Sequence, residues 1–127
     1  MTPEEKARQK IDQWFTDAGW EVINRDDYEP TCTAVAIREG LLKGNLEADY
    51  FLFINGKAVG VLEAKREETD AFSSIVCEQA ALYARSVPNI YQTYQKPLPF
   101  IFTSNGKELY FCDFREQDHY FKQIMTI

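Results

Sequence analysis

Two apolar runs joined by a short polar turn are the clearest pattern in this chain. The segments Tyr50 to Ile54 and Ala58 to Leu62 are apolar at nearly every position, so both faces of each extended strand would be buried. Between them, Asn55-Gly56 is the favoured dipeptide of a two-residue hairpin loop. The pattern predicts a central hairpin that is covered by helices.

A first helix is predicted near the N-terminus. Thr2-Pro3-Glu4-Glu5 is a capping box with proline at the first helical position, and Gly19 is expected to end the helix. One apolar stripe follows the helical period and consists of Ala7, Ile11, Trp14, Phe15 and Ala18. The stripe indicates that one face of this helix packs against the sheet.

The other elements complete a mixed architecture. Strands are expected at Trp20 to Asn24, Phe100 to Thr103 and Glu108 to Phe114, and a second helix is expected around Gln79. The segment Ala34 to Glu39 receives no assignment. The order is helix, three strands, helix and two strands, an α/β (α+β) fold with an αβββαβ core and a mixed central sheet flanked by helices.

Charged residues near the ends of the hairpin strands are the candidate chemistry. Alternate side chains of a strand share a face, so Glu63 and Lys65 are expected to point the same way. An ideal two-residue turn would place Asp49 opposite Leu62. An offset of one residue, from a longer loop or a bulge at Gly60, would place Asp49 opposite Glu63 instead, and we predict this offset as part of the site.

A divalent cation would explain the pairing of Asp49 with Glu63. Carboxylates that face each other repel, so their apposition makes sense chiefly with a cation between them. Oxygen ligands suit Mg²⁺ or Mn²⁺, and the Lys65 ammonium can orient an attacking water and stabilise charge on a phosphate. Taken alone, Glu-x-Lys is a weak motif that is usually a solvated pair.

The stretch Glu47 to Lys65 resembles the PD-(D/E)xK nuclease superfamily, and in particular the N-terminal nuclease domain of type I restriction R subunits. The family pattern is Ala-Asp-Tyr at the start of one strand, Glu-Ala-Lys on the next and Gln-x-x-x-Tyr on a later helix. This chain has the three motifs in that order, as Ala48-Asp49-Tyr50, Glu63-Ala64-Lys65 and Gln79 to Tyr83. The resemblance covers roughly Pro3 to Asp113 and implies a restriction-endonuclease-like core. Ala48 stands where the superfamily pattern often has proline, a departure that the superfamily tolerates.

Residue roles follow from the resemblance. It implies that Asp49 and Glu63 bind Mg²⁺, with the Ala64 carbonyl completing the shell, and that Lys65 assists the nucleophile. It also implies that Gln79 and Tyr83 support DNA handling, although spacing alone favours a core tyrosine with an exposed tip. The superfamily often adds a glutamate from the first helix, which here is Glu4 or Glu5, and the capping box already explains Glu5.

Composition bounds the remaining possibilities. The 127 residues, 45% apolar, suit a single nuclease domain over 1–127 without a second domain. No segment has the length of a membrane span and the charged start is no secretory signal, so a cytoplasmic location is expected. Cys32, Cys77 and Cys112 are expected to be reduced thiols without chemistry, and His119 to be exposed.

The acidic charge bears on how the domain would meet DNA. A net charge of −6 argues against tight autonomous binding, because Lys and Arg contacts to phosphates supply most nonspecific affinity. The basic residues Lys65, Arg66, Arg85, Lys96 and Lys107 are candidates to line one groove. The acidity suggests that partners bring the double-stranded DNA.

The resemblance names those partners. It implies an ATP-driven translocase in the same polypeptide, together with modification and specificity subunits. No phosphate-loop motif occurs, so ATP would bind the full-length motor and not this chain, which we expect to be an N-terminal fragment of a larger R subunit.

Three function classes follow from these observations. The favoured one is the endonuclease domain of a type I restriction-modification system, a type I site-specific deoxyribonuclease. A second is another PD-(D/E)xK nuclease such as a structure-specific resolvase, for which a basic surface and self-association would be expected. A third is a catalytically inactive nuclease-fold module that binds DNA or protein, which would tolerate loss of Asp49, Glu63 or Lys65.

Overall fold

The structure is a computed structural model that describes residues 1–30, 33–116 and 121–126. Two α-helices, two short 3₁₀ turns and seven strands are present in these ranges. In chain order they are α1 (Pro3–Asp17), β1 (Glu21–Asn24), η1 (Arg25–Asp27), β2 (Ala34–Leu41), η2 (Lys43–Asn45), β3 (Glu47–Ile54), β4 (Lys57–Ala64), α2 (Ser74–Ala84), β5 (Phe100–Ser104), β6 (Glu108–Asp113) and β7 (Lys122–Thr126).

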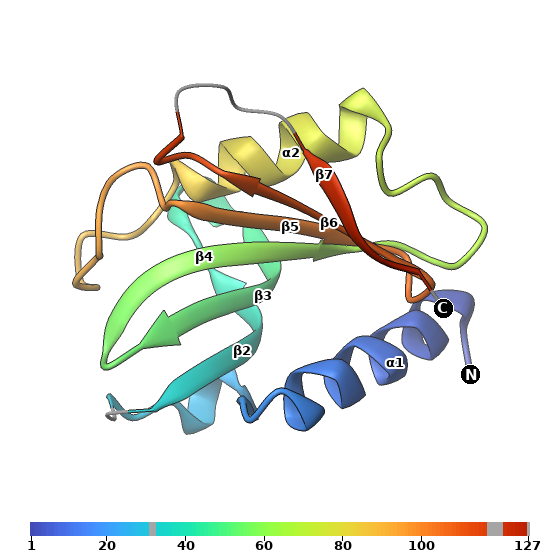
Figure 1. The fold of residues 1–127 in the computed structure, drawn as a ribbon. Coiled ribbons are helices and arrows are strands. Elements are labelled where there is room, and N and C mark those ends of the chain that lie inside the picture. The colour runs from blue at the N-terminus through green and yellow to red at the C-terminus, as the bar shows by residue number, and fades with distance from the viewer. Residues whose placement is uncertain (31–32, 117–120, 127) are drawn as a thin grey trace.

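One mixed sheet forms the centre of the molecule. Over the described residues its seven strands lie side by side in chain order, with β1 parallel to β2, β4 parallel to β5, and the other neighbours antiparallel. Helices α1 and α2 lie on opposite faces of the sheet (Figure 1). The expected α+β fold with a restriction-endonuclease-like core and a sheet between helices is therefore confirmed.

The predicted number of strands is wrong in two places. The unassigned segment around Ala34 to Glu39 is β2, which pairs with β1 on one side and β3 on the other, and β7 adds a strand after β6. The apolar run of β2 ends at Arg38, and Glu39 has a positive φ of 54°. This interruption hides the strand in the pattern, because the strand pairs again at Gly40 and Leu41.

The N-terminal helix begins and ends as predicted. The Glu5 backbone N–H donates to the Thr2 hydroxyl at 3.1 Å and the Thr2 backbone N–H donates to the Glu5 carboxylate at 3.4 Å, which is the capping box. Ala18 caps the C-terminus, and Gly19 follows with a φ of +91°. Neither α1 nor α2 has the length and apolar character that a membrane-spanning helix needs, as far as the described residues extend.

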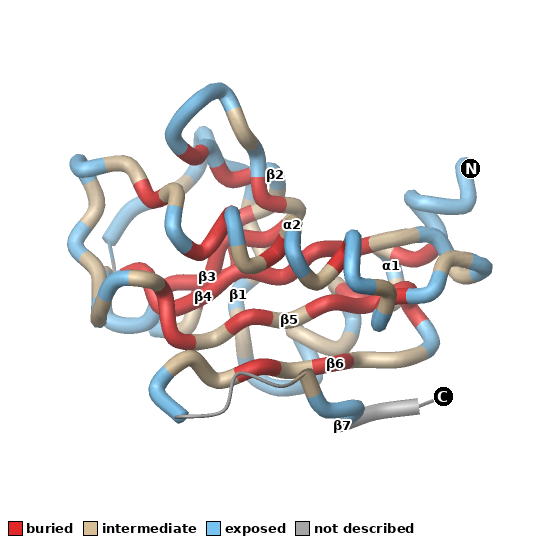
Figure 2. The backbone as a smooth tube through the Cα atoms, turned by 90° about the horizontal axis from the view of Figure 1, so that it is seen from above, coloured by how far each residue is buried: buried red, intermediate tan, exposed pale blue. Residues whose placement is uncertain are grey.

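The hydrophobic core has one part on each face of the sheet. Phe51, Phe53 and Val61 pack with α2, whereas Tyr50, Leu52 and Leu62 pack with α1. The central strands are buried along most of their length, as Figure 2 shows for β3, β4 and β5. This burial on both faces confirms the interpretation of the two apolar runs.

Two of the three cysteines can be placed. Cys112 is buried, Cys77 is half-buried, and both are free thiols, as expected. Burial, followed by the charge of Asp70, raises the pKa of Cys77 to about 11, which makes it a poor nucleophile near neutral pH. Cys32 and His119 lie outside the described residues.

Candidate active site

The β3–β4 hairpin sets the register of the site. Asn55 and Gly56 have positive φ values of 53° and 77°, and Ile54 pairs with Lys57 as an ideal two-residue turn requires. The register then shifts between Leu52 and Phe53, because Val59 is an extra residue on β4. From this bulge onward the pairing is offset by one residue.

The offset brings the two carboxylates together, as predicted. The last pair of the ladder is Tyr50 with Leu62, and continuing it by one residue sets Asp49 opposite Glu63. At this position, hydrogen bonds from backbone N–H groups to the two carboxylates take the place of backbone hydrogen bonds between the strands. The Asp49 N–H donates to Glu63 Oε1 at 3.4 Å, and the Ala64 N–H donates to Asp49 Oδ2 at 2.8 Å.

Glu63 is the buried member of this pair. Its side chain is only 3% exposed, against 17% for Asp49. Burial and then the neighbouring charge of Asp49 raise the pKa of Glu63 to about 8. A buried carboxylate whose charged form is disfavoured is a common property of functional sites.

Lys65 lies beside Glu63, as strand alternation predicts. Its Nζ is 3.9 Å from Glu63 Oε2, and its side chain is 30% exposed. The Lys65 backbone N–H donates to the Ser104 carbonyl at 2.8 Å, which holds this end of β4 against β5. The ammonium therefore sits at the mouth of the site, with the buried carboxylate behind it.

Arg8 is a residue of the site that the sequence analysis missed. Its guanidinium forms an ion pair with Asp49 and a second one, at 3.4 Å, with Glu39. Burial opposes the charged guanidinium, but Asp49 and Glu39 outweigh it and raise the pKa of Arg8. The first helix thus contributes a cation, and not only its apolar stripe, to this end of the sheet.

A second polar contact fixes α1 on the sheet. The Tyr50 hydroxyl donates to Asp12 Oδ1 at 2.5 Å and lies 3.2 Å from the Arg8 carbonyl oxygen, and Asp12 also accepts from Arg38 at 2.8 Å. Burial raises the pKa of Tyr50, and Asp12 adds to this effect. The available signal in the sequence was that Arg8 and Asp12 are four residues apart and flank the buried Ile11.

Gln79 and Tyr83 share a face of α2, as their spacing predicts. Gln79 Nε2 donates to the Tyr83 hydroxyl at 3.0 Å. Tyr83 is 8% exposed within the core on this face. Burial and then the charge of Glu63 raise the pKa of the Tyr83 phenol. The packing role of Tyr83 is established, and its contact with DNA stays a prediction.

Neither predicted auxiliary ligand joins the carboxylate pair in this structure. No group of three histidine, cysteine, aspartate or glutamate side chains is placed to hold a metal within the described part of the chain. Glu5 is engaged in the capping box and Glu4 is exposed. A metal role for either glutamate therefore stays a prediction.

Comparison with known families identifies the domain. The model of the family described as "Type I restriction enzyme R protein N terminus" matches residues 36–120. The chain belongs to this family. The match to the R-protein family includes Asp49, Glu63, Lys65, Gln79 and Tyr83, whereas Arg8 precedes it. No curated protein and no solved structure matches the chain.

Proposed function

We propose that Asp49, Glu63 and Lys65 form the catalytic site of a metal-dependent endonuclease that hydrolyses phosphodiester bonds of double-stranded DNA. The observation that carries this proposal is the close apposition of two carboxylates, one of them buried, with the Lys65 ammonium 3.9 Å from the buried one. Membership in the R-protein family supports it, because the three residues lie within the matched region.

The donor set fits Mg²⁺, or Mn²⁺ in its place. Carboxylate oxygens are the hard ligands that these ions prefer, and both ions commonly take further oxygens from waters and phosphate. Asp49 and Glu63 would hold the ion, with the Ala64 carbonyl as a third oxygen. The raised pKa of Glu63 supports this assignment, because a nearby divalent cation would stabilise the charged form of both carboxylates.

The residues of the chain have distinct tasks in this proposal. The chemistry that Mg²⁺ supplies at such a site is a lowered pKa of a coordinated water and polarisation of a phosphate oxygen. Lys65 orients the attacking water and donates to the phosphate oxygens on which charge develops. Gln79 and Tyr83 close one side of the site and contact the DNA. Arg8, which pairs with Asp49, would compete with the divalent ion for this carboxylate.

The biological setting is also proposed from the family. The domain would cut double-stranded DNA within a type I restriction-modification complex, next to modification and specificity subunits. An ATP-driven translocase in the full-length protein would bring the DNA, and ATP would bind that motor. The net charge of −6 supports this division of tasks, since an acidic domain gains little from nonspecific DNA attraction.

Cleavage by the assembled complex tests the proposal. Asp49→Ala, Glu63→Ala and Lys65→Ala are each expected to lower DNA cleavage by at least about a hundredfold while ATP hydrolysis and translocation continue. Asp26→Ala removes an exposed carboxylate in η1 and is expected to cut like the unmodified protein. Full cleavage by any of the three site variants would remove that residue from the mechanism.

A further inference from the structure

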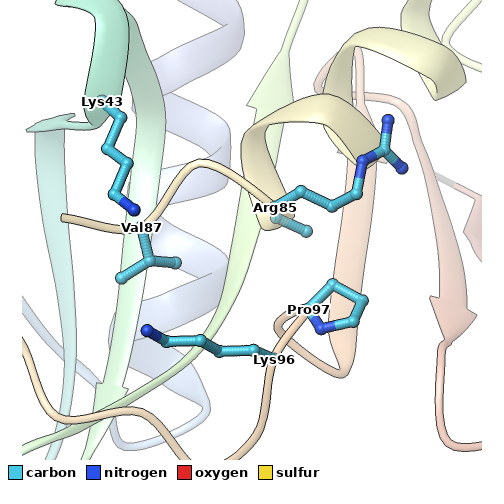
Figure 3. Close-up of a pocket in the computed structure, with 6 residues that line it drawn as sticks. Lys43, Arg85, Val87, Lys96 and Pro97 are labelled. Carbon is cyan, nitrogen blue, oxygen red and sulfur yellow. The ribbon is translucent and has the colours of Figure 1, made fainter. Parts of the chain in front are cut away.

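A second cluster of charge lies away from the carboxylate pair. Lys43 in η2, Arg85 at the C-terminal cap of α2 and Lys96 in the loop before β5 line one pocket of about 300 Å³. Its other lining residues are Ala84, Val87 and Pro97. Figure 3 shows the ammonium groups of Lys43 and Lys96 above and below Val87, whereas the Arg85 side chain runs from the end of α2 away from these two groups.

Backbone hydrogen bonds hold the three segments together. The Lys43 N–H donates to the Ser86 carbonyl at 2.8 Å, and the Leu98 N–H donates to the Ala84 carbonyl at 3.0 Å. Three segments that are distant in the sequence are thereby fixed around the end of α2. The pocket is a built feature of the fold, although its charged side chains are exposed.

Among the residues that the structure describes, these three cations form no ion pair with a carboxylate, in contrast to most other cations. Nine of the fourteen Lys and Arg side chains form ion pairs with carboxylates. Within the described ranges, five make no such pair, and three of the five line this pocket. The five are Lys6, Lys43, Lys57, Arg85 and Lys96. In an acidic chain, such a concentration of unpaired positive charge indicates a site for an anion.

Helix capping does not account for the cluster. Cations near a helix C-terminus often hydrogen-bond its last carbonyls. Here the last carbonyls of α2 already accept from other donors, namely Ser86 on Leu82 and Tyr83, and Leu98 on Ala84. As far as the described residues extend, the cationic groups of Lys43, Arg85 and Lys96 are not engaged by these carbonyls or by carboxylates.

The pocket lies on the same face of the sheet as Tyr83, because Ala84 and Val87, which line it, belong to the same core cluster as Tyr83 and Ala48. Tyr83, whose pKa is raised in part by Glu63, is two residues before Arg85 on the last turn of α2. Lys43 lies in the connection that leads into β3 and Asp49. A duplex that reaches Glu63 past Tyr83 would therefore pass the pocket.

We propose that Lys43, Arg85 and Lys96 bind backbone phosphates of double-stranded DNA and position the duplex for the carboxylate site. The proposal rests on the proposed function for the choice of DNA as the anion. The phosphate site differs from the groove of five basic residues that the sequence suggested. Of those five, Arg85 and Lys96 line the pocket, whereas Lys65, Arg66 and Lys107 pair with glutamates.

DNA binding without metal is the test. A labelled duplex of about 30 base pairs is titrated with the chain in EDTA, and fluorescence anisotropy is recorded at several salt concentrations. Replacing Lys43, Arg85 and Lys96 together by alanine is expected to weaken binding at least about tenfold at low salt and to lower the slope of log K against log salt by about 3.

A second triple variant provides the matched control. Replacing Lys57, Lys107 and Lys122 by alanine changes the net charge equally outside the pocket and is expected to weaken binding by less than about threefold. An equal loss in both triple variants, or no loss in either, would overturn the proposal. A thermal unfolding curve of each variant shows that the fold is retained.

The outcome is separable from that of the nuclease proposal. Asp49→Ala and Glu63→Ala are expected to bind the same duplex in EDTA at least as well as the unmodified chain, because they remove negative charge. Selective loss of binding in the pocket variant together with full cleavage by the Asp49 or Glu63 variants would support the phosphate site and reject the nuclease assignment. Normal binding by the pocket variant together with loss of cleavage in the Asp49 and Glu63 variants would support the nuclease assignment and reject the phosphate site.

Discussion

Arg8 of α1 forms an ion pair with Asp49 of β3, although 41 positions separate the two residues in the chain. The same guanidinium contacts Glu39 of β2. Arg8 thus neutralises the charge of Asp49, the more exposed of the two carboxylates.

Removing Arg8 is expected to strengthen metal binding. In Arg8→Ala, Asp49 no longer has a competing cation, so the Kd for Mn²⁺ in calorimetry should fall by about fivefold, the equivalent of about 1 kcal/mol. Arg25→Ala removes a comparable ion pair, with Glu47 at 3.1 Å, and is the matched control. If both variants shifted the Kd equally, competition at Asp49 would be refuted and only net charge would matter.

The raised pKa of Glu63 predicts a pH-dependent stability of the metal-free domain. The folded state holds the Glu63 proton up to about pH 8, whereas the unfolded state releases it near the ordinary glutamate pKa of 4.5. The resulting stabilisation is therefore fully present below about pH 4.5 and is lost as the pH rises to about 8.

Thermal unfolding of Glu63→Gln measures this effect. The Tm of the variant relative to that of the unmodified domain should rise by at least about 3 °C between pH 4.5 and pH 8. This is the shift expected for about 1 kcal/mol in a domain of this size. Glu4→Gln, at an exposed position, should show no such trend. A constant Tm difference between Glu63→Gln and the unmodified domain across this pH range would contradict the prediction.

Gly60 is predicted to be essential for the pairing of β4 with β5. A Cβ atom at this position would lie 2.2 Å from the Phe100 carbonyl oxygen, so Gly60→Ala must push the two strands apart. We expect a loss of about 2 kcal/mol or more in the free energy of unfolding in urea. Gly19→Ala provides the comparison, because its Cβ would meet no atom within 4 Å and only its positive φ causes strain. A smaller loss at Gly60 than at Gly19 would show that the sheet adjusts to the extra atom.

The Tyr83 hydroxyl can be tested apart from the Tyr83 ring. Tyr83→Phe keeps the buried ring, so the free energy of unfolding should change by less than about 1 kcal/mol, whereas Tyr83→Ala should lose about 3–5 kcal/mol. If the hydroxyl contacts DNA, Tyr83→Phe should also weaken duplex binding by about fivefold. Unchanged binding and cleavage by Tyr83→Phe would leave Tyr83 with a packing role only.

Features that depend on neighbouring residues could be predicted from the sequence alone. The capping box at Thr2, the turn at Asn55-Gly56 and the shared face of Gln79 and Tyr83 each involve residues within a few positions, so local backbone geometry determines them. The offset that pairs Asp49 with Glu63 was predictable as well, because it depends only on the turn and on a bulge next to Gly60.

Only the tertiary structure decided which distant residues meet. The β2 strand is recognisable once β1 and β3 pair with it, since its own pattern breaks at Arg38 and Glu39. The contact of Arg8 with Asp49 and the shared pocket of Lys43, Arg85 and Lys96 depend on where α1 and α2 settle on the sheet. Hydrophobic periodicity determines which face of a helix is buried, but the position of the helix along the sheet follows from packing between segments that are far apart in the chain.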